Sequence, residues 1–360
     1  MVTRIRSLEG FESFLKPKPF ASLQQAAVDG PVIVVNCSEQ RSDAIIVYPN
    51  TDPVLIPLPE APLQMLEELS HKAHLMTKEI EFKTMLKDLW KCLVQPIVQV
   101  LRVHLQKGSR IWWCPTGITA FLPLHAAGDY AKPGQTFPDL YISSYIPTIA
   151  TLLRLRLKVP PKRQHQPRLL VVAQPDAIGQ TPLPFVWEEM ACILSVTPDV
   201  TIIEGDAGTP NAVLDAMEDY PIIHLSCHGH MNHHQPFLSH FSLYSKPLAV
   251  SDLVKRNLLN AELAFLSACH SAAGNLETPD EALHLAASLQ FVGFRSVVGT
   301  MWAMVDEDGP VVAGAFYSSL FGHRSERAPS SAHALHKAVN ALRRLKVSPS
   351  RWACFVHFGC

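Results

Sequence analysis

The most constraining feature of this sequence is a regular alternation of short apolar runs and amphipathic stretches after residue 168. Apolar runs of strand length occur near 169–173, 200–204, 221–225, 263–267, 296–300 and 354–358. Apolar residues recur with helical spacing near 186–195, 210–218, 281–291, 308–321 and 331–346. Because parallel strands need crossover connections, this alternation predicts a mostly parallel sheet with helices on both faces, an α/β fold.

The residues before 168 follow the same pattern less regularly. Strands are predicted at 31–36, 44–48 and 110–115, and helices at 1–30, 61–76, 79–106 and 143–157. The polar, proline-rich stretch 159–168 is the best linker in the chain. These patterns divide the sequence into a helical segment at 1–30, a first half at 31–160 and a second half at 161–360.

Composition narrows the class of protein. The 360 residues are 48% hydrophobic, and 31 basic residues balance 32 acidic ones, so no bulk charge favours nucleic acid or an acidic membrane. No apolar run approaches the roughly 20 residues that span a bilayer, and the start lacks the apolar block of a secretion signal. Eight scattered cysteines without a disulfide framework predict a reducing compartment, the cytoplasm or the nucleus.

Two of the predicted strands end in small-residue turns that carry reactive side chains. The run at 221–225 is followed by His228 and Gly229, and the run at 263–267 by Cys269. Neighbouring parallel strands would place both side chains at the carboxyl edge of the sheet, where open α/β folds keep their sites. An imidazole within reach of a thiol can take its proton and so create the nucleophilic thiolate. The backbone N–H groups of Gly229 and Cys269 are predicted to form an oxyanion hole.

The order of these motifs resembles a known family. Cys269 follows His228 by 41 residues, each after an apolar strand, which is the caspase-type order. The second strand ends in Ser-Ala-Cys, and a Gly-Thr-hydrophobic-Trp segment comes later, here Gly299-Thr300-Met301-Trp302. This pattern resembles the CHAT family, caspase-like proteases related to separase that are often fused to tetratricopeptide repeats. The resemblance runs from about residue 31 to 360 and is strongest from Leu169 onward.

The resemblance implies both an architecture and an activity. The expected fold is a caspase-like sheet in which a degenerate, catalytically inactive caspase-like half at 31–160 precedes an active protease half at 161–360. The implied activity is that of a cysteine endopeptidase that forms a thioester with a protein substrate. The implied partners are upstream tetratricopeptide repeats or a regulatory sensor protein, and whether the chain is part of a longer protein stays open.

His228 is a better candidate for the base than His224. His224 lies inside the apolar strand and is interpreted as a core histidine, whereas His228 stands where Gly229 opens the turn and matches the His-Gly of the family. The sequence contains no evident third member of a triad. Caspase-like enzymes often orient the imidazole with a backbone carbonyl instead.

The residues that select the substrate are less clearly marked. Ser267 stands two residues before Cys269, where metacaspase-like enzymes often have an aspartate for a basic P1 side chain. Asp306 lies in a segment that resembles the part of separase carrying an acid of the S1 pocket, which suggests a basic P1 residue. The alternative is that Asp306 caps a helix that starts near Asp308. Trp302 is predicted either to wall the S1 pocket or to be buried beside a strand.

Two other functions remain open from the sequence. A histidine-rich stretch contains His224, Cys227, His228, His230, His233, His234 and His240. Because their spacing fits no common zinc site, we predict no metal and no cofactor, and a zinc-dependent hydrolase is the lesser alternative. The other alternative is a catalytically silent caspase-like scaffold. No nucleotide-binding glycine motif occurs.

Overall fold

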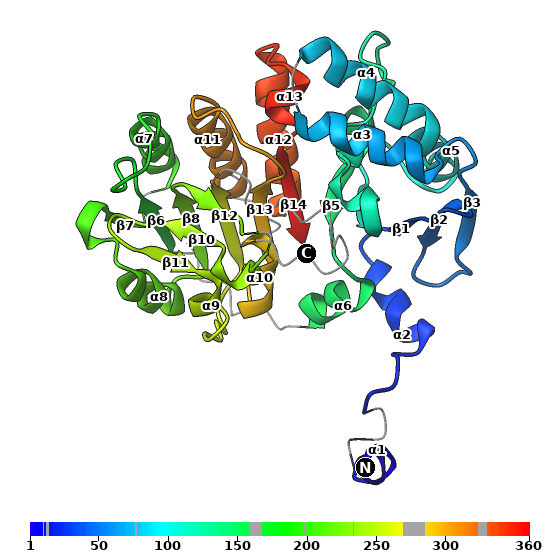
Figure 1. Ribbon diagram of the computed structural model, residues 1–360, viewed down its shortest axis with the longest axis horizontal. Helices are drawn as coiled ribbons and strands as arrows, with labels where there is room; N and C mark the ends of the chain where they lie inside the picture. Colours follow the sequence, from blue (N-terminus) through cyan, green and yellow to red (C-terminus); the bar gives the residue numbers. More distant parts are fainter. Residues whose placement is uncertain are drawn as a thin grey trace.

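The computed structural model describes residues 1–9, 11, 14–75, 78–157, 168–197, 199–232, 234–268, 285–322 and 330–360 (Figure 1). The strands of the main sheet are β1 Val32–Cys37, β2 Ser42–Val47, β3 Val54–Pro57, β4 Arg110–Pro115, β5 Ile142–Tyr145, β6 Leu169–Ala173, β7 Val200–Glu204, β8 Ile222–Ser226, β12 Leu263–Ser267, β13 Ser296–Thr300 and β14 Phe355–Gly359. A small second sheet contains β9 Gly229–His230, β10 His240–Ser242 and β11 Pro247–Ala249.

The helices connect these strands. They are α1 Val2–Arg6, α2 Phe20–Gln24, α3 Leu63–Leu75, α4 Glu79–Leu89, α5 Gln95–His104, α6 Ile149–Leu157, α7 Val186–Val196, α8 Pro210–Asp219, α9 Val250–Leu253, α10 Leu285–Val292, α11 Asp308–Phe321, α12 Ser331–Arg344 and α13 Pro349–Trp352. Within the described ranges, no helix combines the length and the apolar character that a membrane span needs.

The main sheet is continuous across both halves of the chain. Its described strands lie in the order β3-β2-β1-β4-β5-β14-β13-β12-β8-β6-β7. Neighbours within the second half, from β13 to β7, are parallel, as are β1, β4 and β5. The last strand, β14, is antiparallel to β13 and parallel to β5. The parallel strands β1, β4 and β5 therefore run opposite to β13, β12, β8, β6 and β7, and the two sets end at opposite edges of one sheet.

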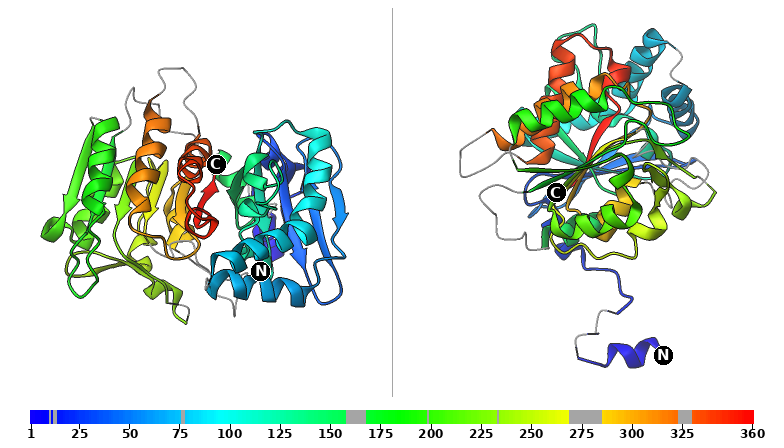
Figure 2. Two further views of the ribbon diagram at one scale, coloured as in Figure 1. Left: turned by 90° about the horizontal axis from the view of Figure 1, so that it is seen from above. Right: turned by 90° about the vertical axis from the view of Figure 1, so that its left-hand side faces the viewer.

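Helices cover both faces of this sheet, as the sequence predicted. In the second half, α7, α11 and α12 lie on one face and α8, α9 and α10 on the other (Figures 1 and 2). In the first half, α3, α4 and α5 lie on one side, and α2 and α6 on the other (Figure 1). One cluster of buried apolar residues extends through strands of both halves, so the halves share a core.

Strand β3 was not predicted from the sequence, and two predicted helices of the first half differ in the structure. Residues 143–145, predicted to be helical, belong to β5, and the helix begins only at Ile149. Pro147 marks this boundary, because a proline disfavours helical geometry in the residue before it. The helix predicted for 79–106 is divided by a π-helical turn, Trp90–Val94, just before Pro96 at the start of α5. A proline lacks the N–H that an unbroken helix would use at this point.

The segment 1–30, predicted to be one amphipathic helical stretch, contains two short helices among its described residues. Helix α1 has no buried residue, and it lies away from the body of the molecule (Figures 1 and 2). Contact with the body begins around α2 and the short turn that follows, where Ala26 and Ala27 are buried. Only the end of the segment 1–30 therefore packs against the rest of the protein.

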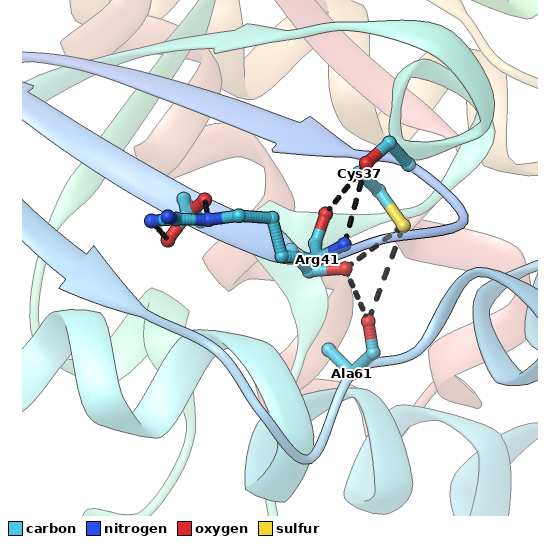
Figure 3. A network of polar contacts seen from close by, with 6 residues as sticks. Cys37, Arg41 and Ala61 are labelled. Atoms are coloured by element: carbon cyan, nitrogen blue, oxygen red, sulfur yellow. Dashed lines mark hydrogen bonds and ion pairs between the residues drawn. The ribbon is translucent and has the colours of Figure 1, made fainter.

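The turn between β1 and β2 is held by side chains (Figure 3). The hydroxyl of Ser38 donates to the Arg41 carbonyl at 3.1 Å, and that of Ser42 donates to the Ala61 carbonyl at 2.5 Å. The Ser42 hydroxyl also lies 2.9 Å from the thiol of Cys37. Burial raises the pKa of Cys37, so this cysteine is a structural part of the turn and a poor nucleophile.

Candidate active site

The candidate site lies at the carboxyl ends of β6, β8, β12 and β13. Strands β8 and β12 are parallel neighbours, as predicted, and Ser226 at the end of one is opposite Ser267 at the end of the other. His228 stands two residues after Ser226, and Cys269 two residues after Ser267 in the sequence. Cys269 lies outside the described residues, which stop at Ala268 on this side. The geometry of the site is therefore described from the His228 side.

The imidazole of His228 is oriented by a backbone carbonyl. Its Nε2 atom donates a hydrogen bond to the carbonyl of Thr181, in the loop after β6, at 2.7 Å. A neutral imidazole has one donor and one acceptor nitrogen, so this bond leaves Nδ1 as the acceptor. The main chain is also fixed, because the Ser242 N–H donates to the His228 carbonyl at 2.8 Å. Among the described contacts, a backbone carbonyl thus fixes the orientation of this imidazole.

Gly229, the predicted oxyanion donor, directly follows this histidine. It belongs to β9 and is paired with Phe241 of β10 in an antiparallel register. The residue is partly exposed, as is His228. The small sheet thus fixes the backbone of the turn while leaving it accessible from solvent.

Asp306 lies near His228 and does not cap α11, the helix that follows it. The N-cap of α11 is Glu307, and the Asp306 carboxylate instead accepts a hydrogen bond from the Phe185 N–H at 3.1 Å. Burial and the nearby charge of Glu189 raise the pKa of Asp306 above its ordinary value. The bond from Phe185 and the charge of His228 act in the opposite direction. The structure therefore places an acid with a raised pKa within electrostatic reach of the predicted base.

The other two residues predicted for substrate selection have different surroundings. The Ser267 hydroxyl, almost fully buried, lies 3.8 Å from the sulfur of Met304. The indole of Trp302 is 3% exposed, and its N–H donates to the Ser350 carbonyl at 2.9 Å. Its ring also lies edge-to-face with Phe82 of α4, with centroids 5.6 Å apart. The described contacts of Trp302 are thus with α4 and α13.

A buried polar network behind β8 was not anticipated. The carboxylate of Glu189, on α7, accepts a hydrogen bond from the Ser226 hydroxyl at 2.5 Å, and its other oxygen lies 3.4 Å from His224 Nε2. The Nδ1 atom of His224 lies 3.1 Å from the Tyr317 hydroxyl, and the ring stacks on Phe265. Because His224 is fully buried in this network, its interpretation as a core histidine is confirmed.

This network predicts a measurable dependence of stability on Ser226. Replacing Ser226 by alanine removes a hydrogen bond from a buried carboxylate, and we expect the free energy of unfolding to fall by about 1–3 kcal/mol. Urea titration monitored by circular dichroism measures the loss. The control is Ser195→Ala on the exposed side of α7, the helix that carries Glu189, where a change within about 0.5 kcal/mol is expected. Equal unfolding midpoints for both variants would contradict the prediction.

The remaining histidines form no metal site among the described residues. His125 is partly buried between the Tyr145 hydroxyl, 2.9 Å from Nδ1, and the Ala353 carbonyl, 3.0 Å from Nε2. Burial lowers the pKa of His125 to about 4, as expected for a structural residue. In the described part of the histidine-rich stretch and elsewhere in the described chain, no group of three or more His, Cys, Asp or Glu is placed to hold a metal ion.

Comparisons with known proteins identify the family and the fold. A family model described as the CHAT domain matches residues 83–360. The structure is similar to separase in two crystal structures of the separase–securin complex of Saccharomyces cerevisiae, each with a TM-score of 0.65 and 11% identity. The match covers 94% of this chain but only 31% and 30% of the separase chains, so this chain spans about a third of their length.

A second similar structure is the Arg-specific cysteine proteinase gingipain R. Its TM-score is 0.52 with 9% identity, and the match covers 75% of this chain and 68% of that one. No curated protein sequence matches. Identities this low establish the fold alone, and this chain has the caspase-like fold that separase and gingipain share. The family match begins at residue 83, later than the residue 31 expected from the motifs.

Proposed function

We propose that this chain, which belongs to the CHAT domain family, is a cysteine endopeptidase with His228 and Cys269 as its catalytic pair. The observation that carries the proposal is the bond from His228 Nε2 to the Thr181 carbonyl, 2.7 Å long, at the carboxyl end of β8. It leaves Nδ1 as a proton acceptor, beside the strand that Cys269 follows in the sequence. A base held in one tautomer is what activation of a thiol requires.

The proposed reaction follows from these groups. Nδ1 of His228 takes the thiol proton of Cys269, and the thiolate attacks the scissile carbonyl carbon. The N–H groups of Gly229 and Cys269 stabilise the oxyanion that forms. The imidazolium then gives its proton to the leaving amine as the C–N bond breaks. Water, deprotonated by the same imidazole, hydrolyses the thioester and releases the thiol.

We also propose that the enzyme prefers arginine or lysine at P1. Asp306 is a carboxylate near His228, and burial has already raised its pKa. A cationic side chain bound beside it would offset the cost of its charge in this environment. Asp306 lies in the loop after β13, in the segment whose sequence resembles the part of separase that carries an acid of the S1 pocket. Gingipain R, which has a similar fold, is itself Arg-specific.

We propose that the protease acts in the cytoplasm or nucleus. Its partners there are a protein substrate and a protein regulator. The similar separase chains are in complex with securin. Upstream tetratricopeptide repeats or a regulatory sensor protein would control the activity of this protease. Purification of the chain with its interacting proteins, followed by a cleavage assay of each, tests this part of the proposal.

The catalytic assignment is tested by labelling with an electrophilic peptide that carries arginine at P1. We expect the probe to modify Cys269, mapped by mass spectrometry, and Cys269→Ala to abolish labelling. The other cysteines provide internal controls, because burial raises the pKa of five of them, namely Cys37, Cys92, Cys114, Cys192 and Cys360. Equal labelling of Cys192 and Cys269, or none at Cys269, would favour the silent scaffold.

A further inference from the structure

The loop that carries Asp306 is anchored at both ends by one short helix. This loop, 301–307, joins β13 to α11. Near its start, the indole N–H of Trp302 donates to the carbonyl of Ser350 in α13, at 2.9 Å. Just past its end, the carboxylate of Asp308 receives two hydrogen bonds from the next residue of α13, Arg351. Neighbouring residues of one helical turn thus hold the two ends of the loop.

The bond between Arg351 and Asp308 is a bidentate pair. Arg351 Nε donates to Asp308 Oδ2 at 2.9 Å, and Nη2 donates to Oδ1 at 2.7 Å. Arg351 Nη2 also contacts the carboxylate of Glu307. The Asp308 side chain is 3% exposed, so its charge is buried and paired with a guanidinium in the fixed fork geometry that a carboxylate matches. Such a pair determines where the residues before Asp308 lie.

Helix α13 is in turn supported by the first half of the chain. The Ser350 hydroxyl donates to Glu79 of α4 at 2.6 Å, and Phe82 of α4 packs edge-to-face on Trp302. Helix α4 therefore contacts both α13, which holds the loop, and Trp302 within the loop. The first half, expected to be catalytically inactive, contributes to the position of a loop that ends beside His228.

Asp306 is the residue through which α13 and the loop that it holds affect the site. The Val305 carbonyl accepts from the Asp308 N–H at 3.0 Å, and the Asp306 carbonyl accepts from the Gly309 N–H at 3.0 Å. The first bond ties the residue before Asp306 to Asp308, which Arg351 holds, and the second ties Asp306 to the residue after Asp308. The Asp306 carboxylate in turn accepts from the N–H of Phe185, the residue at the start of α7.

We propose that Arg351 is a positioning residue that fixes the Asp306 carboxylate for binding a basic P1 side chain, an inference that rests on the proposed function. Arg351 acts through Asp308 and the loop, and the described hydrogen bonds and ion pairs of its side chain are with Glu307 and Asp308. Its effect should therefore appear in the affinity for basic substrates and in the order of the loop.

The test is Arg351→Lys, which keeps the positive charge near buried Asp308 but cannot form the bidentate pair with its carboxylate. For a P1-arginine peptide we expect kcat/KM to fall about fivefold or more, mainly through KM. For a P1-norleucine peptide the change should stay within about twofold. A second variant, Arg351→Gln with Asp308→Asn, removes both charges together and should act in the same direction, so that no unpaired buried charge is created.

The matched control is Arg256→Lys. Arg256 also binds two acids, Glu218 at 2.6 Å and Asp215 at 2.9 Å, but these belong to α8. We expect this variant to leave the P1 preference unchanged. If Arg351→Lys likewise leaves the preference unchanged in an enzyme that cleaves peptides, the inference is wrong while the proposed function stands.

Hydrogen exchange gives a readout that does not need activity. The Phe185 amide is protected by Asp306, so in Arg351→Lys its exchange should accelerate about tenfold or more, and in Arg256→Lys it should not. If the parent protein neither cleaves peptides nor labels at Cys269, the proposed function fails. The exchange rate of Phe185 still decides whether Arg351 positions Asp306, because an unchanged rate would exclude it.

Discussion

Cys269→Ala and His228→Ala are each expected to lower kcat/KM for a cleaved peptide on the order of 10³-fold or more, and the double variant no further. A nucleophile and its base act as one unit, because the thiolate forms only when the imidazole takes the proton. Steady-state hydrolysis of a fluorogenic peptide by the three variants measures the losses. Strict additivity of the two single losses would contradict a shared proton transfer.

The controls for this comparison use neighbouring residues of the same type. His230→Ala, two residues further along and exposed, should retain activity, as should Cys192→Ala on α7. All variants should keep the unfolding midpoint of the parent, because His228 is partly exposed and its described side-chain contact is one carbonyl. If His228→Ala cleaves as fast as the parent, His228 is not the base and the catalytic proposal fails.

The strands around the site could be predicted because every residue in them is buried. Strands β6, β8, β12 and β13 are buried along their whole length, so they appear in the sequence as uninterrupted runs dominated by apolar residues. Strand β5 could not be found this way. Its Ser143 hydroxyl accepts from the Trp113 indole at 3.2 Å, and Ser144 accepts from Arg110 at 2.9 Å. Polar residues with distant partners leave no local apolar pattern.

The way the two halves join could not be predicted from local sequence patterns either. The last strand of the chain, β14, lies between β5 and β13 and reverses the direction of the sheet. Apolar runs locate a strand but do not say which strand it pairs with. The predicted boundary near residue 160 remains a prediction, because the sheet and the core continue across it.

Within the site, the side chains could be predicted from the sequence, whereas the backbone groups that bind them could not. The motifs pointed to His228 and Asp306 by residue type, and the structure places these two close enough to interact. The carbonyl of Thr181 and the N–H of Phe185 carry no side-chain signature, so no pattern could identify them. Glu189 did leave a signal, since it stands with helical spacing among Val186, Met190 and Ile193 on the buried face of α7.

Asp306→Asn is expected to reduce the preference for P1 arginine over P1 norleucine about 10- to 150-fold at neutral pH. The estimate is the value of a charge-assisted hydrogen bond, about 1.5–3 kcal/mol, lost only by the basic substrate. The measurement is the ratio of kcat/KM values for the two peptides. Asparagine keeps the size and the acceptor for the Phe185 N–H, so a change in the ratio reports charge. An unchanged ratio would remove Asp306 from the S1 pocket.

The same preference should depend on pH in the parent enzyme and not in Asp306→Asn. Because the pKa of Asp306 is raised, its carboxyl group gains a proton at a higher pH than an ordinary aspartate. The preference for arginine should therefore be full well above that pKa and decline as the pH falls through it. Stability changes in the opposite sense, since a raised pKa means that the ionised form is less well tolerated in the folded state than in the unfolded chain. Asp306→Asn should consequently not lower the free energy of unfolding at neutral pH, which separates a loss of selectivity from a loss of fold.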